Sequence, residues 1–176
     1  MPNDELVHDR LTESIIGAFY EVYNKLGYGF FEGAYVKALM IELGYKGLEV
    51  QHEVGVDLYY KGHRLGRQRV DLIVDEKVIV EVKATEQLPR VAYRQCFSYL
   101  KTCGLEVGLI LHFGPEPGIK RVRSSGLALG PNTEVVFPVE AGPRKWSPDD
   151  AQAIDDFLDG ESDDDDHDAD QSPRPS

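Results

Sequence analysis

Asp71, Glu81 and Lys83 are the residues of this sequence whose types and spacing are best suited to chemistry. They stand in the stretches Arg69-Val70-Asp71-Leu72 and Glu81-Val82-Lys83-Ala84. Two carboxylates that converge on one face suit a hard divalent cation such as Mg²⁺ or Mn²⁺, which polarises a phosphoryl oxygen and activates water. A lysine beside them can steady the attacking hydroxide and the charge that develops on phosphorus. This set of residues is therefore typical of a site for phosphodiester cleavage.

Two predicted strands, residues 65–74 and 78–84, must position these side chains. Asp71, Glu81 and Lys83 fall on odd positions of the two strands, whereas five apolar residues fall on even ones: Leu72, Val74, Val78, Val80 and Val82. Successive side chains of a strand point to opposite faces, so the even face is expected in the core and the odd face is expected to hold charge. Asp71 can pair with Glu81 only if the loop has an odd number of residues, such as the three of 75–77. A two-residue turn would instead pair Asp71 with Val80.

A surface strand pair with ordinary salt bridges is the competing interpretation, because Glu-x-Lys occurs often by chance. The rest of the sequence has to distinguish the metal-site interpretation from this one. Apolar periodicity and Gly or Pro signals predict helices over 11–26, 31–43 and 89–101, with Gly27, Gly44 and Gly104 as stop signals. Alternation predicts a strand over 48–60 that turns at 61–63, and an unbroken apolar run predicts a buried central strand over 107–113. Short strands at 120–123 and 134–139 are expected to finish the sheet.

The charge of the chain is unevenly distributed. The net charge is −12, yet residues 147–176 hold 12 of the 31 acidic residues and one of the 19 basic residues. Residues 1–146 are therefore close to neutral, and they are predicted to form one domain. Residues 147–176 are predicted to be an acidic extension with a short helix at 148–158 and a disordered, low-complexity tail. The tail is expected to keep the protein soluble; competition with nucleic acid for basic residues is the alternative.

In this order and spacing, the stretches resemble the PD-(D/E)XK nuclease superfamily. Within it the chain resembles the small GxxExxY family, whose naming motif appears as Gly29-Phe30-Phe31-Glu32-Gly33-Ala34-Tyr35. The resemblance spans about residues 8–140 and includes 69–72, 81–84 and Gln95-Cys96-Phe97-Ser98-Tyr99-Leu100-Lys101. It implies a restriction-endonuclease-like α/β fold, in which a central mixed sheet is flanked by helices in the order helices, strand meander, helix and further strand.

The resemblance also implies roles for particular residues. A glutamate on an N-terminal helix reaches the metal in that superfamily, which implies Glu32 as a third carboxylate; a solvated helix residue is the alternative. Gln95 and Tyr99 reproduce the Gln-x-x-x-Tyr helix motif of RecB-like members, which contacts the site or the substrate strand. Simple core packing is the alternative for Tyr99. The Val82 carbonyl is expected to complete the metal shell, and Tyr35 is expected to pack beneath Glu32.

Basic residues cluster in sequence around the proposed site and are expected to contact phosphates. Arg69 and Arg94 are the two assigned to substrate binding, although a salt bridge with a carboxylate is the alternative for Arg69. The others are Lys61, Arg64, Arg67, Arg90 and Lys101.

The predicted function is Mg²⁺- or Mn²⁺-dependent hydrolysis of phosphodiester bonds in nucleic acid, with DNA favoured over RNA. A non-catalytic nucleic-acid or protein-binding module that keeps the nuclease fold is the alternative. No Gly-x-x-x-x-Gly-Lys-Ser/Thr loop or Gly-x-Ser-x-Gly elbow occurs, which argues against a nucleotide-cofactor enzyme or a hydrolase of that type. No apolar run approaches the roughly 18 residues of a membrane span, so no membrane partner and a cytoplasmic location are expected. A homodimer is left open.

Overall fold

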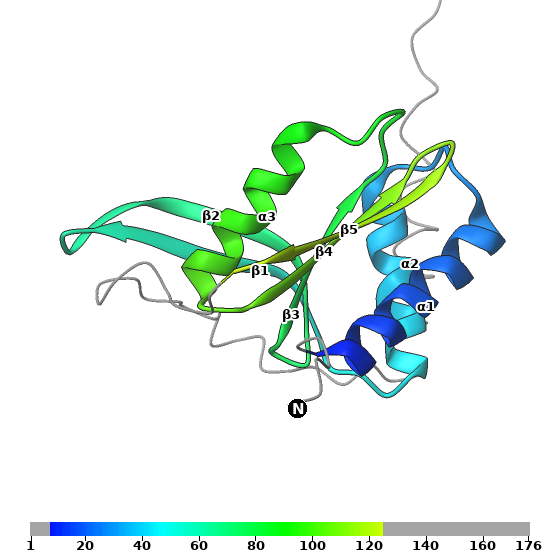
Figure 1. Ribbon diagram of the computed structural model, residues 1–176, viewed down its shortest axis with the longest axis horizontal. Coiled ribbons are helices and arrows are strands. Elements are labelled where there is room, and N and C mark those ends of the chain that lie inside the picture. Colours follow the sequence, from blue (N-terminus) through cyan, green and yellow to red (C-terminus); the bar gives the residue numbers. More distant parts are fainter. Residues whose placement is uncertain (1–7, 125–176) are drawn as a thin grey trace, which may run out of the picture. The chain divides into compact units, whose positions relative to one another are not determined.

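The computed structural model describes residues 8–124, whose elements are shown in Figure 1. They are α1 (Asp9–Leu26), α2 (Glu32–Tyr45), β1 (Val50–Tyr60), β2 (His63–Val74), β3 (Val78–Lys83), α3 (Arg90–Cys103), β4 (Val107–Phe113) and β5 (Pro117–Arg123). The strand expected at 134–139, the helix at 148–158, the acidic tail and the domain boundary after residue 146 lie outside the described residues. None of the described helices has the length and apolar character needed to cross a membrane.

The five strands form one mixed sheet in the order β1-β2-β3-β4-β5. Neighbouring strands run antiparallel except β3 and β4, which are parallel and are joined through α3. A parallel pair needs such a crossover, because a tight hairpin can join only antiparallel strands. The predicted α/β fold with a central mixed sheet flanked by helices is therefore confirmed.

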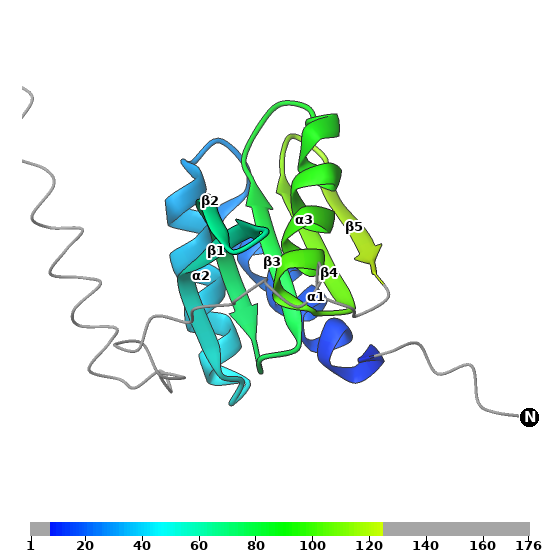
Figure 2. The ribbon, with the colours of Figure 1, turned by 90° about the vertical axis from the view of Figure 1, so that its left-hand side faces the viewer.

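Helices cover both faces of the sheet, as Figure 2 shows. One hydrophobic core lies between the sheet and the pair α1 and α2, and it includes Phe19, Leu39 and Leu109. A second core lies between the sheet and α3, and it includes Ile79, Leu100 and Ile110. Strand β4 is buried along its whole length, as its apolar run predicts, because it lies in the sheet interior between the two cores.

The hairpin of β2 and β3 has the predicted register. Val74 pairs with Val78 across the three-residue turn 75–77, and the ladder continues to Leu72 opposite Val80. The even-numbered apolar residues of both strands lie in the core beneath α1 and α2 (Leu72, Val74, Val78, Val80 and Val82). The odd face, however, does not hold charge alone, since Ile73 and Ile79 are fully buried there against α3. Asp71, Glu81 and Lys83 therefore lie at the end of a second buried layer.

Several element boundaries differ from the prediction, and two of them have a clear local cause. The turn between β1 and β2 contains Lys61 and Gly62 only, because His63 already pairs with Tyr60. Helix α2 continues through Gly44 to Tyr45, and the left-handed residue that follows it is Gly47, at a φ of 75°. A glycine is tolerated inside a helix, and the stop comes where the backbone needs a positive φ.

Candidate active site

The site begins where β2 and β3 separate. Their ladder ends at the pair Leu72 and Val80, and the next residues along the two strands are Asp71 and Glu81. The Asp71 carboxylate fills the gap, since its Oδ2 accepts a hydrogen bond of 2.8 Å from the Val82 N–H. A side chain thus satisfies a β3 donor, and Asp71 and Glu81 are held next to each other.

Glu81 is the most deeply buried acid of the site, at 1% exposed. Its Oε1 accepts a hydrogen bond of 2.7 Å from Lys83 Nζ, while its Oε2 is buried without a hydrogen-bond partner within residues 8–124. Burial, together with the nearby charge of Asp71, raises the pKa of Glu81 to about 7, although Lys83 acts in the opposite direction. Glu81 therefore keeps one oxygen available for a further cation.

The Asp71 and Lys83 pKa values shift for related reasons. Burial raises the pKa of Asp71, and the hydrogen bond from Val82 and the charge of Lys83 only partly oppose this effect. Burial also acts to lower the pKa of Lys83, but the hydrogen bond and charge of Glu81 outweigh it and raise the pKa overall. The lysine is thus a fixed cation, and the two carboxylates carry more negative charge than it can neutralise.

Glu32 approaches the same place from the opposite helical layer. It is the first residue of α2, its Oε2 lies 3.4 Å from the Ala84 N–H that donates to it, and its Oε1 lies 3.8 Å from Lys83 Nζ. Tyr35 fixes this end of α2 from beneath: its ring stacks on Phe113 with 4.1 Å between centroids, and its hydroxyl donates to the Gly27 carbonyl. Tyr35 is thus a packing residue near the start of α2, and its position beneath Glu32 stays a prediction.

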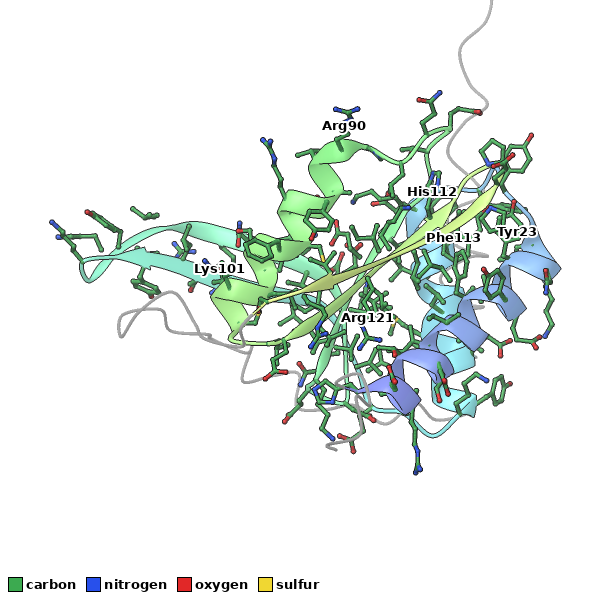
Figure 3. All side chains as sticks on the ribbon, in the orientation of Figure 1. Tyr23, Arg90, Lys101, His112, Phe113 and Arg121 are labelled. Carbon is green, nitrogen blue, oxygen red and sulfur yellow. The ribbon has the colours of Figure 1, made fainter. Side chains whose placement is uncertain are left out.

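Phe113 is the last residue of β4, and aromatic rings from α1 and α2 pack against it. Tyr23 of α1 lies against it, as the labelled side chains in Figure 3 show, and the Tyr23 hydroxyl donates to the carbonyls of Gly114 and Pro115. Helix α1 and the loop after β4 are thereby joined next to α2. This aromatic cluster sets the position from which Glu32 reaches the end of β3.

The donors at this site suit a hard divalent cation, although the side chains do not form a complete cage. Within residues 8–124 no three His, Cys, Asp or Glu side chains are grouped closely enough to hold a metal ion. The ammonium of Lys83 lies within 4 Å of both Glu32 and Glu81 and occupies part of the space between them. The unpartnered Glu81 Oε2 beside Asp71 nevertheless offers carboxylate oxygens of the kind that Mg²⁺ and Mn²⁺ prefer.

Gln95 and Tyr99 lie on one face of α3 and are hydrogen-bonded to each other. The Gln95 Nε2 donates to the Tyr99 hydroxyl over 2.6 Å. Burial raises the pKa of Tyr99, and the charges of Glu81 and Asp71 raise it further, which places the phenol within electrostatic reach of both acids. Tyr99 is therefore both a buried side chain and a neighbour of the site, so the two interpretations of this residue are compatible.

The two predicted substrate arginines lie farther out. Arg69 forms an exposed ion pair of 3.3 Å with Glu53 of β1, so its partner is a carboxylate, as the alternative interpretation proposed. Arg94 lies on the exposed side of α3. Neither guanidinium contacts Asp71 or Glu81 among the described interactions, and both are open to solvent.

His112 was not among the predicted site residues, although it borders the site. It pairs with Lys83 across β3 and β4, and its Nε2 lies 2.7 Å from the Thr85 carbonyl. It is therefore a hydrogen-bonded histidine at the edge of the site. His52 of β1 also lies within electrostatic reach of Asp71, but burial outweighs that charge and lowers its pKa.

Because the pKa of Glu81 is raised, we expect the affinity for a metal ion to depend on pH. Below about pH 7 the carboxyl is protonated in the metal-free protein, and a proton must leave before a cation can bind. We expect the Mn²⁺ affinity to rise about tenfold per pH unit up to pH 7 and to level off above it. Isothermal titration calorimetry from pH 5.5 to 8.5 measures this dependence. An affinity that is flat across the range would contradict the assignment of Glu81 as a ligand.

Comparison with known proteins gives the family of the chain. The family model of the PD-(D/E)XK nuclease superfamily matches residues 9–122, and the chain therefore belongs to this superfamily. Among solved structures it is similar to one titled "Crystal structure of SSO0001", at 17% identity and a TM-score of 0.40, covering 56% of this chain and 53% of that chain. The chain thus spans about half the length of that solved chain. No curated protein matches the sequence.

Proposed function

We propose that this chain is a metal-dependent nuclease of the GxxExxY type that hydrolyses phosphodiester bonds in nucleic acid, with DNA preferred to RNA. The observation that carries the proposal is Glu81, a buried carboxylate with one oxygen on Lys83 and the other without a partner, directly beside Asp71. A structural salt bridge has no need for the second, unsatisfied oxygen or for a second acid that raises the pKa of the first.

Each residue of the site has a proposed role. Asp71 and Glu81 hold Mg²⁺ or Mn²⁺, with the Val82 carbonyl in the same shell and Glu32 assisting directly or through water. The chemistry that such an ion supplies when bound is polarisation of a phosphoryl oxygen and acidification of water. Lys83 donates from Nζ, orients the attacking water and stabilises the negative charge that develops on phosphorus.

The substrate contacts lie on α3 and β2. Gln95 and Tyr99 together present an amide and a phenol beside the carboxylates, and we assign them to positioning the substrate strand. Arg69 and Arg94 are exposed cations suited to contact phosphates on either side of the cleaved bond.

Substrate profiling combined with metal titration tests the proposal. Purified protein is titrated calorimetrically with Mn²⁺ and then assayed on single- and double-stranded DNA and RNA. We expect a bound metal ion and cleavage that EDTA abolishes. Metal-independent cleavage would contradict the mechanism, and nucleic-acid binding without metal or cleavage would instead support the non-catalytic module.

Asp71→Asn should weaken Mn²⁺ binding while it preserves the fold. The asparagine amide keeps an oxygen that can accept the Val82 N–H, so the strand ends stay joined, but one ligand charge is lost. We expect the affinity to fall about tenfold or more, because even the outer-shell partners of metal ligands typically contribute that much. Calorimetry gives the affinity and thermal melting checks the fold; unchanged Mn²⁺ affinity would remove Asp71 from the metal site.

A further inference from the structure

The outer part of the hairpin of β1 and β2, residues 54–70, forms a two-stranded ribbon that extends beyond the pairing of β2 with β3. Strand β2 pairs with β3 only as far as Leu72, and beyond that point β1 and β2 pair with each other up to Tyr60 and His63. The turn residues Lys61 and Gly62 have φ values of 49° and 78°, which suit the right-handed twist of such a ribbon. Figure 1 shows it projecting from the other described elements.

The ribbon begins at the site and reaches far from it. Asp71 lies on β2, the second strand of the ribbon, nine positions after Gly62 at the tip. At about 3.3 Å per residue the tip lies roughly 30 Å from the Asp71 backbone. An extended ligand bound at the carboxylates could therefore contact the ribbon over that distance.

Positive charge is concentrated on the ribbon. It carries four of the 16 basic residues of the segment 8–124 (Lys61, Arg64, Arg67 and Arg69) but only one of the 15 acidic residues, Asp57. The Asp57 carboxylate accepts hydrogen bonds of 2.8 and 2.9 Å from Arg67 and of 3.1 Å from Arg64, and the bond from Arg67 lowers its pKa to about 2. Asp57 thus stays charged and orients two guanidinium groups, and the ribbon keeps a net positive charge.

The base of the ribbon is fixed and its tip is exposed. Val54, Val56 and Val70 pack against α3, and Gln68 lies within hydrogen-bonding distance of Ser98 on that helix. Toward the tip, Tyr60 is 60% exposed and Leu65 is 62% exposed. An apolar and cationic tip on an anchored base is suited to enter a groove rather than to pack within its own chain.

A groove lies on the ribbon and at its base. It has a volume of about 400 Å³ and is lined by Glu53, Gly55, Arg67, Gln68 and Arg69. A Cβ on Gly55 would come within 3.1 Å of the Arg67 side chain, so the glycine leaves room for that arginine. The ion pair of Arg69 with Glu53 is exposed and stabilises little, so Arg69 can exchange this partner for a phosphate.

We propose that this ribbon binds duplex DNA by entering the major groove, with its cations on phosphates that flank the cleaved bond. The proposal rests on the nuclease function, because it assumes that the scissile phosphate lies at Asp71 and Glu81. The major groove of B-form DNA, about 12 Å wide, admits a two-stranded ribbon, whereas the major groove of an RNA duplex is too narrow and deep. The reach of the ribbon corresponds to about nine base pairs at 3.4 Å each.

A second copy of the chain is the competing occupant of the ribbon. The excess of positive charge argues against it, since symmetric pairing of two ribbons would bring like charges together. The distribution of charge instead matches a polyanion. The chain as a whole carries a net charge of −12, so a basic ribbon is the exception within it.

DNA binding by the full-length protein in EDTA tests the proposal without any need for cleavage. Fluorescence anisotropy compares the double variant Lys61→Ala and Arg64→Ala with a control double variant, Arg10→Ala and Lys120→Ala, that removes two exposed cations elsewhere. On a DNA duplex of about 30 base pairs we expect the ribbon variant to bind at least tenfold more weakly, with its salt slope reduced by about 2. The control should bind within about twofold of the wild type.

Two further nucleic acids of the same sequence and a second ribbon variant complete the test. An RNA duplex and a DNA single strand of the same sequence should bind more weakly and respond less to the ribbon variant. Lys61→Glu at the turn should weaken duplex binding even if the double variant melts early. Equal losses in ribbon and control variants, equal binding of the RNA duplex, or a dimer that the ribbon variant dissolves in sedimentation would overturn the proposal. Ribbon-dependent DNA binding without cleavage would refute the nuclease function alone.

Discussion

Lys83→Met should lower cleavage by about 10²- to 10³-fold, the loss expected when a donor to the developing phosphoryl charge is removed. Methionine keeps most of the apolar stem of the lysine, so the packing at the end of β3 is preserved. The variant loses only the ammonium, which donates to Glu81 over 2.7 Å and lies 3.8 Å from Glu32. Single-turnover cleavage at saturating Mg²⁺ measures the effect.

Unlike the cleavage rate, the affinity for Mn²⁺ should not fall in Lys83→Met. Without the ammonium, Glu81 and Asp71 repel each other more strongly, and a divalent cation becomes their only neutralising partner. We therefore expect Mn²⁺ to bind Lys83→Met at least as tightly as it binds the wild type. The matched control is Lys77→Met in the exposed turn between the same two strands, which should retain full cleavage. Equal activity of the two variants would exclude a catalytic role for Lys83.

Glu81→Gln should abolish metal-dependent cleavage and at the same time stabilise the metal-free protein. The glutamine has nearly the same shape but carries no charge into the buried position. Loss of one of two principal ligand carboxylates should reduce the Mn²⁺ affinity and the cleavage rate by at least 100-fold. A variant that removes a buried charge needed for the chemistry is expected to be more stable and less active than the wild type.

The stability gain has a defined pH dependence. Glu81 has a pKa of about 7 in the folded protein and an ordinary value of 4.5 when unfolded. As the pH rises from 4.5 to 7 the unfolded chain releases this proton and the folded protein retains it, so wild-type stability falls over that window and then levels off. The full pKa shift corresponds to at most about 3 kcal/mol in the free energy of unfolding. The variant also loses the charged hydrogen bond between Glu81 and Lys83, which reduces this gain. Glu81→Gln is therefore expected to be roughly 1–3 kcal/mol more stable than the wild type at pH 8.

Near pH 5 the wild type and Glu81→Gln should differ little, because Glu81 is then already protonated. Urea unfolding in EDTA at pH 5 and pH 8 gives both free energies of unfolding. Glu76→Gln, in the exposed turn before β3, serves as the control and should show no such pH-dependent difference. A Glu81→Gln variant that is less stable than the wild type at pH 8 would show that the carboxylate serves the fold.

The register that places Asp71 and Glu81 on one face of β2 and β3 could be predicted from the sequence because it follows short-range rules. A three-residue turn and a strict alternation fix which residues pair and which face they share, and both were observed from Val74 to Leu72 and from Val78 to Val80. The buried strand β4 was predicted with its observed ends because an apolar run bounded by turn residues leaves little freedom.

Other features depend on contacts that periodicity does not contain. The odd face of β2 and β3 is covered by α3, which joins two parallel strands and must pack against the sheet between them. The bond from the Val82 N–H to Asp71 arises because the ladder stops one residue earlier, and nothing local to either strand marks that point. His112 meets Thr85 only because β3 and β4 are parallel and in that register.

Cleavage of labelled single- and double-stranded DNA and RNA by the full-length protein tests the central claim most directly. The reactions contain Mg²⁺ or Mn²⁺, and parallel samples contain excess EDTA or the Glu81→Gln variant. The account predicts cleavage by the wild type with metal, strongest on duplex DNA, and none with EDTA or with Glu81→Gln. Cleavage that persists in EDTA or in the variant, or a metal-loaded wild type that cleaves none of the four substrates, would contradict it.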